Sequence, residues 1–151
     1  MSTEENLKKL NIKLPNAPDP VGSYVASRKT GNLVFISGQV PFDEKGNIIK
    51  GKLGKDLNLE EGQKAASLCA LNILAQLKKI CGNLDQVKGC VKITGYVNSL
   101  DSFVDQPKVI NGASDLISKV LGDKGKHARA AISANSLPLG AAVEVEAIFE
   151  I

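Results

Sequence analysis

The residue with the clearest chemical potential in this chain is Arg129, which stands among small apolar residues in the segment HARAAISA. A guanidinium keeps its positive charge at any ordinary pH, so this side chain must face water or hold an anion. In an extended segment Arg129 shares a face with Ala131 and Ser133, whose small side chains leave a hollow beside it. Such a hollow suits a planar carboxylate held by two parallel hydrogen bonds.

A salt bridge within the chain is the alternative interpretation of Arg129. The C-terminal segment AAVEVEAIFEI alternates between apolar and polar residues, which predicts a strand with Glu144 and Glu146 on one face. If that strand lay beside the strand of Arg129, either glutamate could neutralise the guanidinium. The spacing leaves both interpretations open.

The remaining reactive residues give weaker signals. His127 is the only histidine, which excludes a histidine cluster, and we interpret it as a loop residue. Cys69, Cys81 and Cys90 form no CxxC pair and have no neighbouring base, so inert thiols are expected. No phosphate loop, dinucleotide fingerprint or zinc spacing occurs, and we predict no metal and no cofactor.

Composition narrows the class of protein. The formal net charge is +3 and apolar residues make up 43% of the 151 residues, which is ordinary for a globular domain. This small charge and the scarcity of aromatic residues argue against nucleic-acid binding, and no segment is apolar enough to suggest a membrane partner. We expect one cytoplasmic domain over residues 1–151, in which residues 1–20 form a short helix and a proline-rich arm.

Hydrophobic periodicity predicts an α+β fold in which two long helices cover one face of a mixed six-stranded sheet. In the strand near residues 90–98 we expect Val91, Ile93 and Val97 to share one face, opposite Lys92, Thr94 and Tyr96. The strand segment NLVFIS is apolar on both faces, so the second face of the sheet should be covered by another copy of the chain. The predicted long helices span about 58–82 and 105–121, and five of the six strands are placed at about 32–37, 47–54, 90–98, 127–134 and 141–151.

Four separated motifs resemble one known family. The segment ARAAISANSLPLGAAVEVEAI resembles the C-terminal signature of the RidA/YjgF family, which is also described as endoribonuclease L-PSP. Upstream, VGSYVAS resembles the family's Gly-x-Tyr segment, LVFISGQVPFD its Ser-Gly-Gln strand, and GYVNSLDSF its strand-to-helix corner. The resemblance covers residues 20–151 in the same order.

The resemblance implies a chorismate-mutase-like fold and a homotrimer with ligand clefts between subunits. It also implies hydrolysis of enamine and imine intermediates, such as 2-aminoacrylate or 2-iminobutanoate, to 2-keto acids and ammonia without a cofactor. By this resemblance, Arg129 would hold the substrate carboxylate and Glu144 would activate the attacking water. The residues that would line the cleft are Tyr24, Ser37, Gly38 and the second-helix asparagine, Asn111.

One position departs from the family pattern. Many deaminases of the family carry a cysteine two residues after the arginine, and this chain has Ala131 there. A small-carboxylate binding or regulatory protein without turnover therefore stays open as an alternative. An endoribonuclease is a third reading, although the chain lacks a pair of histidines for acid–base cleavage.

Overall fold

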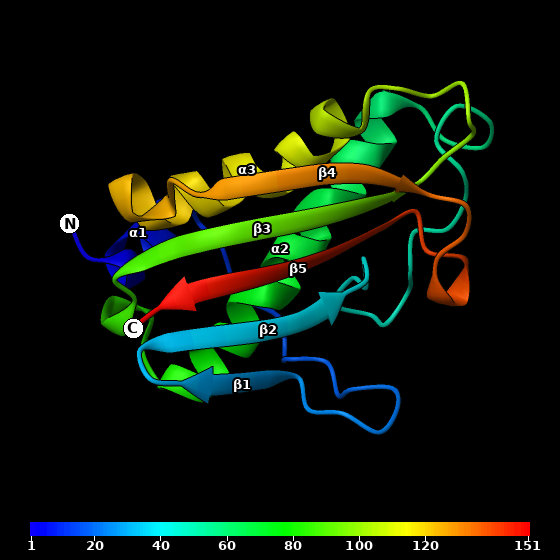
Figure 1. Cartoon of the computed structure of the whole chain (residues 1–151). Coiled ribbons are helices and arrows are strands. Elements are labelled where there is room, and N and C mark those ends of the chain that lie inside the picture. Colours follow the sequence, from blue (N-terminus) through cyan, green and yellow to red (C-terminus); the bar gives the residue numbers. More distant parts are fainter.

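The computed structural model describes all residues from 1 to 151 and contains one sheet flanked by helices (Figure 1). Three short 3-10 turns connect the elements: η1 (Leu84–Gln86), η2 (Gly122–Gly125) and η3 (Pro138–Gly140). In chain order the helices and strands are α1 (Thr3–Lys9), β1 (Ser27–Thr30), β2 (Leu33–Gln39), α2 (Leu59–Cys81), β3 (Gly89–Asn98), α3 (Gln106–Leu121), β4 (Ala128–Ala134) and β5 (Val143–Glu150).

The sheet has five strands in the order β1-β2-β5-β3-β4, so the prediction of six strands was wrong. Only β3 and β4 run parallel, and β4 forms one edge. The segment expected as a strand at 47–54 makes isolated bridges only, for example between Lys50 and Ala141. Strand β1 was not predicted, because its sequence SRKT lacks apolar alternation at this largely exposed edge.

The two long helices begin and end as their capping residues dictate. The Asn58 side chain accepts a hydrogen bond from the Glu61 backbone amide, and the Glu61 carboxylate accepts one from the Asn58 backbone amide, which forms a capping box at the start of α2. Gly82 ends α2 with a φ of 78°, and α3 matches its predicted span within a residue. No helix combines the length and the apolar character needed to traverse a bilayer.

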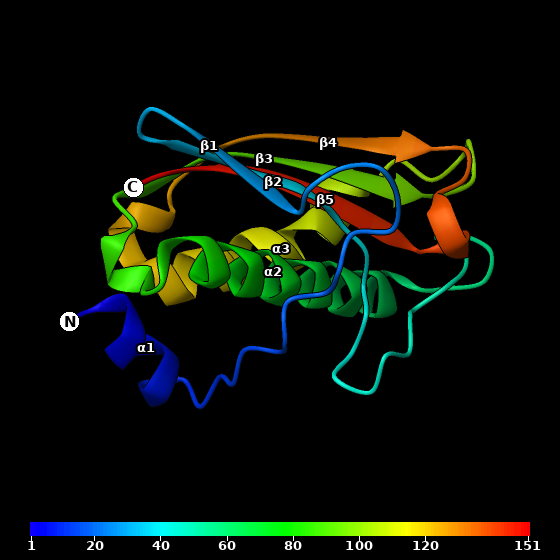
Figure 2. The same ribbon diagram turned by 90° about the horizontal axis from the view of Figure 1, so that it is seen from below.

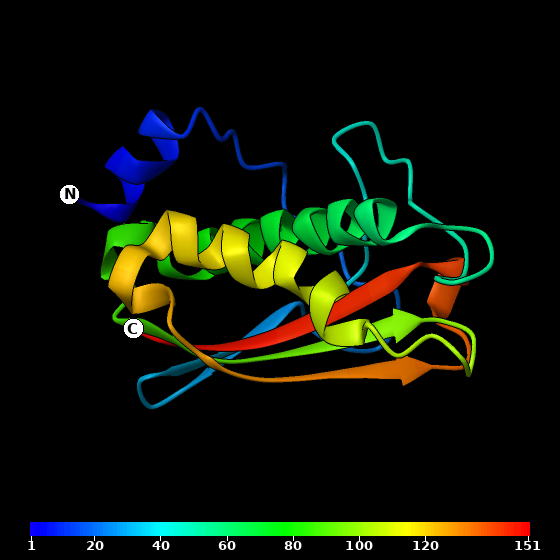
Figure 3. The same ribbon diagram turned by 90° about the horizontal axis from the view of Figure 1, so that it is seen from above.

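Helices α2 and α3 pack side by side on one face of the sheet and leave the other face open (Figures 2 and 3). Alternate residues of β5 are buried against the helices, as predicted, whereas Phe35 on β2 and Ile132 on β4 are exposed to 42% and 49%. A bulge between Cys90 and Lys92 places Val91 at the surface while Ile93 and Val97 are buried, so the prediction that Val91 shares their face was wrong.

The N-terminal helix α1 docks beside η1 and the end of α3. The Glu4 carboxylate lies 3.0 Å from the Lys78 ammonium and also accepts the Leu84 amide at 3.0 Å. Further along the arm, the Pro18 carbonyl accepts a hydrogen bond of 2.6 Å from the side chain of Gln76 on α2. These contacts hold the arm close to α2. The chain then continues from the arm to the start of β1.

Gly112 sets the distance between α2 and α3. A Cβ at this position would lie 2.1 Å from the Gln63 carbonyl oxygen. We expect Gly112→Ala to lower the free energy of unfolding by about 2–3 kcal/mol, because overpacking outweighs the helix propensity of alanine. Urea denaturation at fixed protein concentration measures this change.

Gly89→Ala is the matched control, because the nearest atom to its added Cβ is 3.7 Å away. It should change the unfolding midpoint little. Equal stability of the Gly112→Ala and Gly89→Ala variants would show that the helices do not touch at this crossing.

Candidate active site

The predicted site residues fall into two separate groups in the folded chain. The first, the arginine cluster, consists of Arg129 and Ala131 on β4 with Asn111 and Ser114 on α3. The second, the glutamate pocket, is a cavity of about 270 Å³ whose lining includes Tyr24, Gly38, Gln39, Pro138, Leu139 and Glu144.

In the arginine cluster, neutral oxygens surround the guanidinium of Arg129. Its Nη1 donates to Asn111 Oδ1 at 2.8 Å and to Ser114 Oγ at 3.2 Å, while Nη2 donates to the Pro107 carbonyl at 3.3 Å. All three acceptors belong to α3, where Asn111 and Ser114 share a face because they are three residues apart. The helix thus fixes the direction in which the arginine points.

Two N–H groups of Arg129 have no protein acceptor. A guanidinium has five N–H groups, and those left over are one on Nε and one on Nη2. Free guanidinium N–H donors are suited to binding a carboxylate. The Nδ2 donor of Asn111 also has no protein partner. These donors suit an anionic ligand.

The salt bridge considered from the sequence does not form. Strand β3 lies between β4 and β5, so Arg129 is not next to Glu144 or Glu146. The register places Arg129 beside the buried Ile93, on the helix side of the sheet, whereas Glu144 alternates with the buried Val143 and Val145 and lies on the open side. None of the ion pairs in the structure includes Arg129.

Ala131 lies two residues after Arg129 on the same face of β4 and packs against the hydrophobic core. Its methyl group adds neither a thiol nor a hydrogen-bond donor to the arginine cluster. Any polar assistance at this position must therefore come from another residue.

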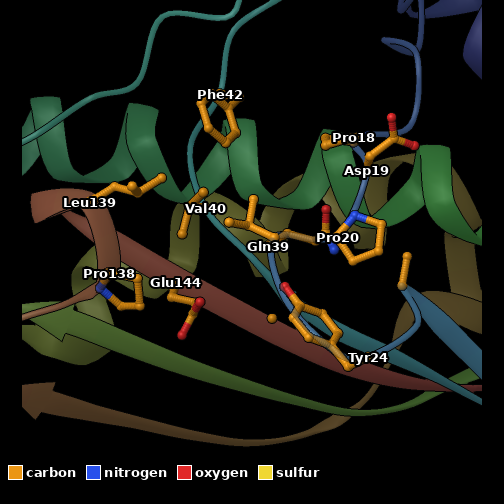
Figure 4. Close-up of a pocket in the computed structure, with 13 residues that line it drawn as sticks. Pro18, Asp19, Pro20, Tyr24, Gln39, Val40, Phe42, Pro138, Leu139 and Glu144 are labelled. Carbon is orange, nitrogen blue, oxygen red and sulfur yellow. The ribbon is translucent and has the colours of Figure 1, made fainter.

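In the glutamate pocket, a bulge brings the backbone of β2 against Glu144. The β2–β5 register shifts between Ile36 and Gln39, and a Cβ on Gly38 would lie 2.9 Å from Glu144 Cδ. A bulge and a close approach of the backbone to a side chain thus coincide at Gly38. The phenol of Tyr24 and the carboxylate of Glu144 line the same cavity (Figure 4).

Burial raises the pKa of Glu144, and the negative charge of Glu146 raises it further. Glu146 itself accepts a hydrogen bond from the Tyr96 hydroxyl at 2.9 Å. A carboxyl group with a raised pKa exchanges protons at milder pH than an ordinary glutamate does. Glu144 is thus suited to accept a proton from water and to return it.

Ser37 does not point into the glutamate pocket. Its hydroxyl donates to the Val25 carbonyl at 2.7 Å and so holds the segment that carries Tyr24. The side chain lines a neighbouring hollow on the open face of the sheet, together with Tyr24 and Glu146. Its position supports the site rather than contacting the space next to Glu144.

None of the three thiols lines the glutamate pocket or accepts from Arg129. Cys69 and Cys90 are buried; burial, with the nearby charge of Glu144, raises the pKa of Cys69, and burial raises that of Cys90 to about 12. Cys69 belongs to the hydrophobic core, and its Sγ lies 3.7 Å from the Val143 carbonyl oxygen. The fold brings together no set of three or more His, Cys, Asp or Glu side chains that could hold a metal ion.

Sequence reasoning missed Ser114 as a partner of Arg129. The signal was present, because Ser114 follows Asn111 by three residues on a helix, which places both on one face. It also missed Gln39, which lines the glutamate pocket and whose amide donates to the Ser37 carbonyl at 3.0 Å. Gln39 belongs to the Ser-Gly-Gln motif that marked this strand.

Known proteins match the chain over nearly its whole length. Residues 4–151 match the family described as "YjgF/chorismate mutase-like, putative endoribonuclease". Protein TCP17 of Trypanosoma cruzi is 46% identical over 147 residues, which cover 97% of this chain and 92% of TCP17.

Two crystal structures share the fold. The protein Atu1372 of Agrobacterium tumefaciens is 45% identical with a TM-score of 0.90, covering 99% of this chain and 94% of Atu1372. A structure from Shewanella oneidensis, described as a "putative endoribonuclease", is 32% identical with a TM-score of 0.96, and the match covers 100% of both chains. The fold, the motifs and these matches agree, and the chain belongs to the YjgF/RidA family.

Proposed function

We propose that the chain hydrolyses enamine and imine intermediates derived from 2-amino acids, such as 2-aminoacrylate or 2-iminobutanoate, to 2-keto acids and ammonia. The observation that carries this proposal is the unoccupied side of the Arg129 fork. The guanidinium meets only neutral acceptors, and one N–H on Nε and one on Nη2 have no protein acceptor. A 2-imino acid supplies the planar carboxylate that this side requires.

The proposed site is completed by a second copy of the chain. Within one chain Arg129 and Glu144 lie on opposite faces of the sheet, with β3 between their strands. Because β4 is an edge strand, its arginine is free to meet the glutamate pocket of a neighbouring copy. The apolar side chains on the open face, such as Phe35 and Ile132, favour the same association. The homotrimer implied by the family resemblance would provide three such sites.

The reaction follows from these groups. Arg129 holds the carboxylate, which places the adjacent imine carbon. The imine reacts in its protonated form. The Glu144 carboxylate of the neighbouring copy takes a proton from a water molecule as the water oxygen bonds to that carbon, and the C=N electrons move to nitrogen, which gives a neutral carbinolamine. The glutamic acid then returns its proton to the nitrogen, the C–N bond breaks as the O–H electron pair forms the C=O bond, and the hydroxyl proton passes to the departing ammonia, which leaves a 2-keto acid and an ammonium ion. An enamine enters the same route after protonation of its terminal carbon.

Binding of a small carboxylate without turnover is the second candidate function, and Ala131 is the observation that favours it. The arginine cluster would serve either function, whereas rapid hydrolysis also needs a well-placed water. Glu144 must supply that placement because Ala131 has no polar atom.

Substitutions of Arg129 and Glu144 separate the two candidates. We expect Arg129→Ala to abolish both imine hydrolysis and 2-oxobutanoate binding, because the carboxylate loses its only cation in the cluster. Glu144→Gln should keep binding and lose most of the turnover. Ammonia release is measured in an assay coupled to a pyridoxal-phosphate threonine dehydratase, and binding is measured by thermal shift. A wild-type protein that binds but never accelerates ammonia release would leave only the binding function.

Co-expression of the two variants tests whether the site spans two copies. Each variant alone should be inactive, but mixed oligomers contain some interfaces with an intact Arg129 and an intact Glu144. Random assembly should restore about one quarter of the wild-type sites. Absence of any recovery in verified mixed oligomers would show that both residues act within one chain.

The pH profile should report the raised pKa of Glu144. Because Glu144 acts as a base, kcat/KM should decrease on acidification, and the midpoint of this decrease should lie at a pH above the ordinary glutamate pKa of about 4.3. Glu146→Gln removes a negative charge that disfavours ionisation of Glu144, so this limb should move to lower pH. Asp19→Asn, a substitution elsewhere in the pocket lining, serves as the control. A limb that stays in place in Glu146→Gln would assign it to another group.

A further inference from the structure

A chain of hydrogen bonds leads from the guanidinium of Arg129 through Ser114 to His127. Ser114 Oγ, which accepts from Arg129 Nη1, also lies 2.9 Å from His127 Nε2. On the other side of the ring, His127 Nδ1 lies 2.6 Å from the Gly125 carbonyl oxygen. His127 is therefore not a free loop residue, although its place just before β4 suggested one.

The chemistry of the groups fixes the direction of this chain. A carbonyl oxygen only accepts, so the Nδ1 of His127 must carry the proton, and the Nε2 of the neutral ring then accepts from the Ser114 hydroxyl. With its proton turned toward histidine, Ser114 offers its lone pairs to Arg129 Nη1. Each group thus donates to the next, from Arg129 through Ser114 and His127 to Gly125.

The far end of the chain is held rigidly. Gly125 is buried, and a Cβ there would lie 2.7 Å from the Ser118 Cα and 2.9 Å from the Ile117 carbonyl oxygen. Only glycine allows η2 to lie this close to the backbone of α3. The carbonyl that orients His127 is therefore fixed by packing against the same helix that supplies Ser114.

We propose that His127 and Ser114 are positioning residues that hold the Arg129 fork in its binding geometry, and that they do so only while His127 is neutral. Protonation of Nε2 turns His127 into a donor toward Ser114. The serine hydroxyl then cannot donate back to the ring, and an imidazolium faces a guanidinium across one oxygen atom. The repulsion favours movement of the Arg129 side chain away from Asn111.

Charged groups around His127 do not supply a competing partner. Asp123 and Lys126 pair with each other at 3.3 Å, and both side chains are highly exposed. No ion pair in the structure includes His127. The other charged residues on the elements that surround it are Lys108, Asp115 and Lys119 on α3, Lys124 on η2, Lys92 on β3 and Arg129 itself; Lys108 pairs with Asp105.

The geometry can be tested without any assay of activity, because His127 is the only histidine in the chain. Imidazole 15N NMR of the full-length protein should show the Nδ1–H tautomer at neutral pH. On acidification, the Nε–H resonance of Arg129, identified by its loss in Arg129→Lys, should move with the same midpoint as His127. An Nε2–H tautomer, or an arginine resonance indifferent to the His127 titration, would overturn the proposal.

The role in positioning rests on the proposed function and is tested with variants. Ser114→Ala and His127→Ala should raise the KM for 2-iminobutanoate, or the Kd for 2-oxobutanoate, by about tenfold, with a smaller effect on kcat. Ser114→Thr keeps the hydroxyl and should restore the affinity. Ser118→Ala, an exposed serine one turn further along α3, is the matched control.

The results distinguish a failure of the proposed reaction from a failure of the positioning role of Ser114 and His127. If the wild-type protein has no deaminase activity but the NMR coupling and the Kd changes appear, the proposed reaction fails and the positioning role stands. If the variants bind and react like the wild-type protein, the positioning role is wrong whatever the reaction. Acidification should weaken 2-oxobutanoate binding in the wild-type protein and not in His127→Ala, which also separates this effect from protonation of Glu144.

Discussion

An arginine whose charge is met only by neutral oxygens is the constraint on which the site depends. Asn111, Ser114 and the Pro107 carbonyl orient the guanidinium but do not neutralise it. All three come from α3, so the position of that helix determines where the charge points. The helix can lie close enough because glycines meet it: Gly95 faces Ile110, and Gly125 faces the α3 backbone. The glycines that appear to serve packing therefore also position the arginine.

The glutamate pocket is built by a different device, and its separation from the arginine has a physical consequence. Gly38 in the β2 bulge lets the backbone lie against Glu144, which buries the carboxyl group and raises its pKa. Had Arg129 been on the same face of a neighbouring strand, the two charges would have paired and lost their reactivity toward a ligand. Opposite faces of one sheet keep the two charges apart within one copy of the chain.

The sequence predicted those features that depend on local patterns. The Asn58 capping box, the span of α3 and the alternation of β5 follow from neighbouring residues alone. Strand order does not, so the salt bridge from Arg129 to Glu144 or Glu146 could be excluded only once β3 was placed between them. The short polar strand β1 and the bulge at Val91 lack a local signature. His127 gained a role only when η2 and α3 were seen in contact.

Ala131 stands where many deaminases of the family have a cysteine, so a water molecule in the site cannot be held by a polar atom at this position. Near the guanidinium, Asn111 Oδ1 and the Ser114 hydroxyl are already engaged by Arg129, and Ala131 contributes only a methyl group. The polar atoms near the guanidinium are thus already hydrogen-bonded to the arginine, apart from the free Nδ2 donor of Asn111. In the proposed hydrolysis, the attacking water would then be held by the glutamate with the raised pKa. Turnover in this protein should depend more on Glu144 than it does where a cysteine assists.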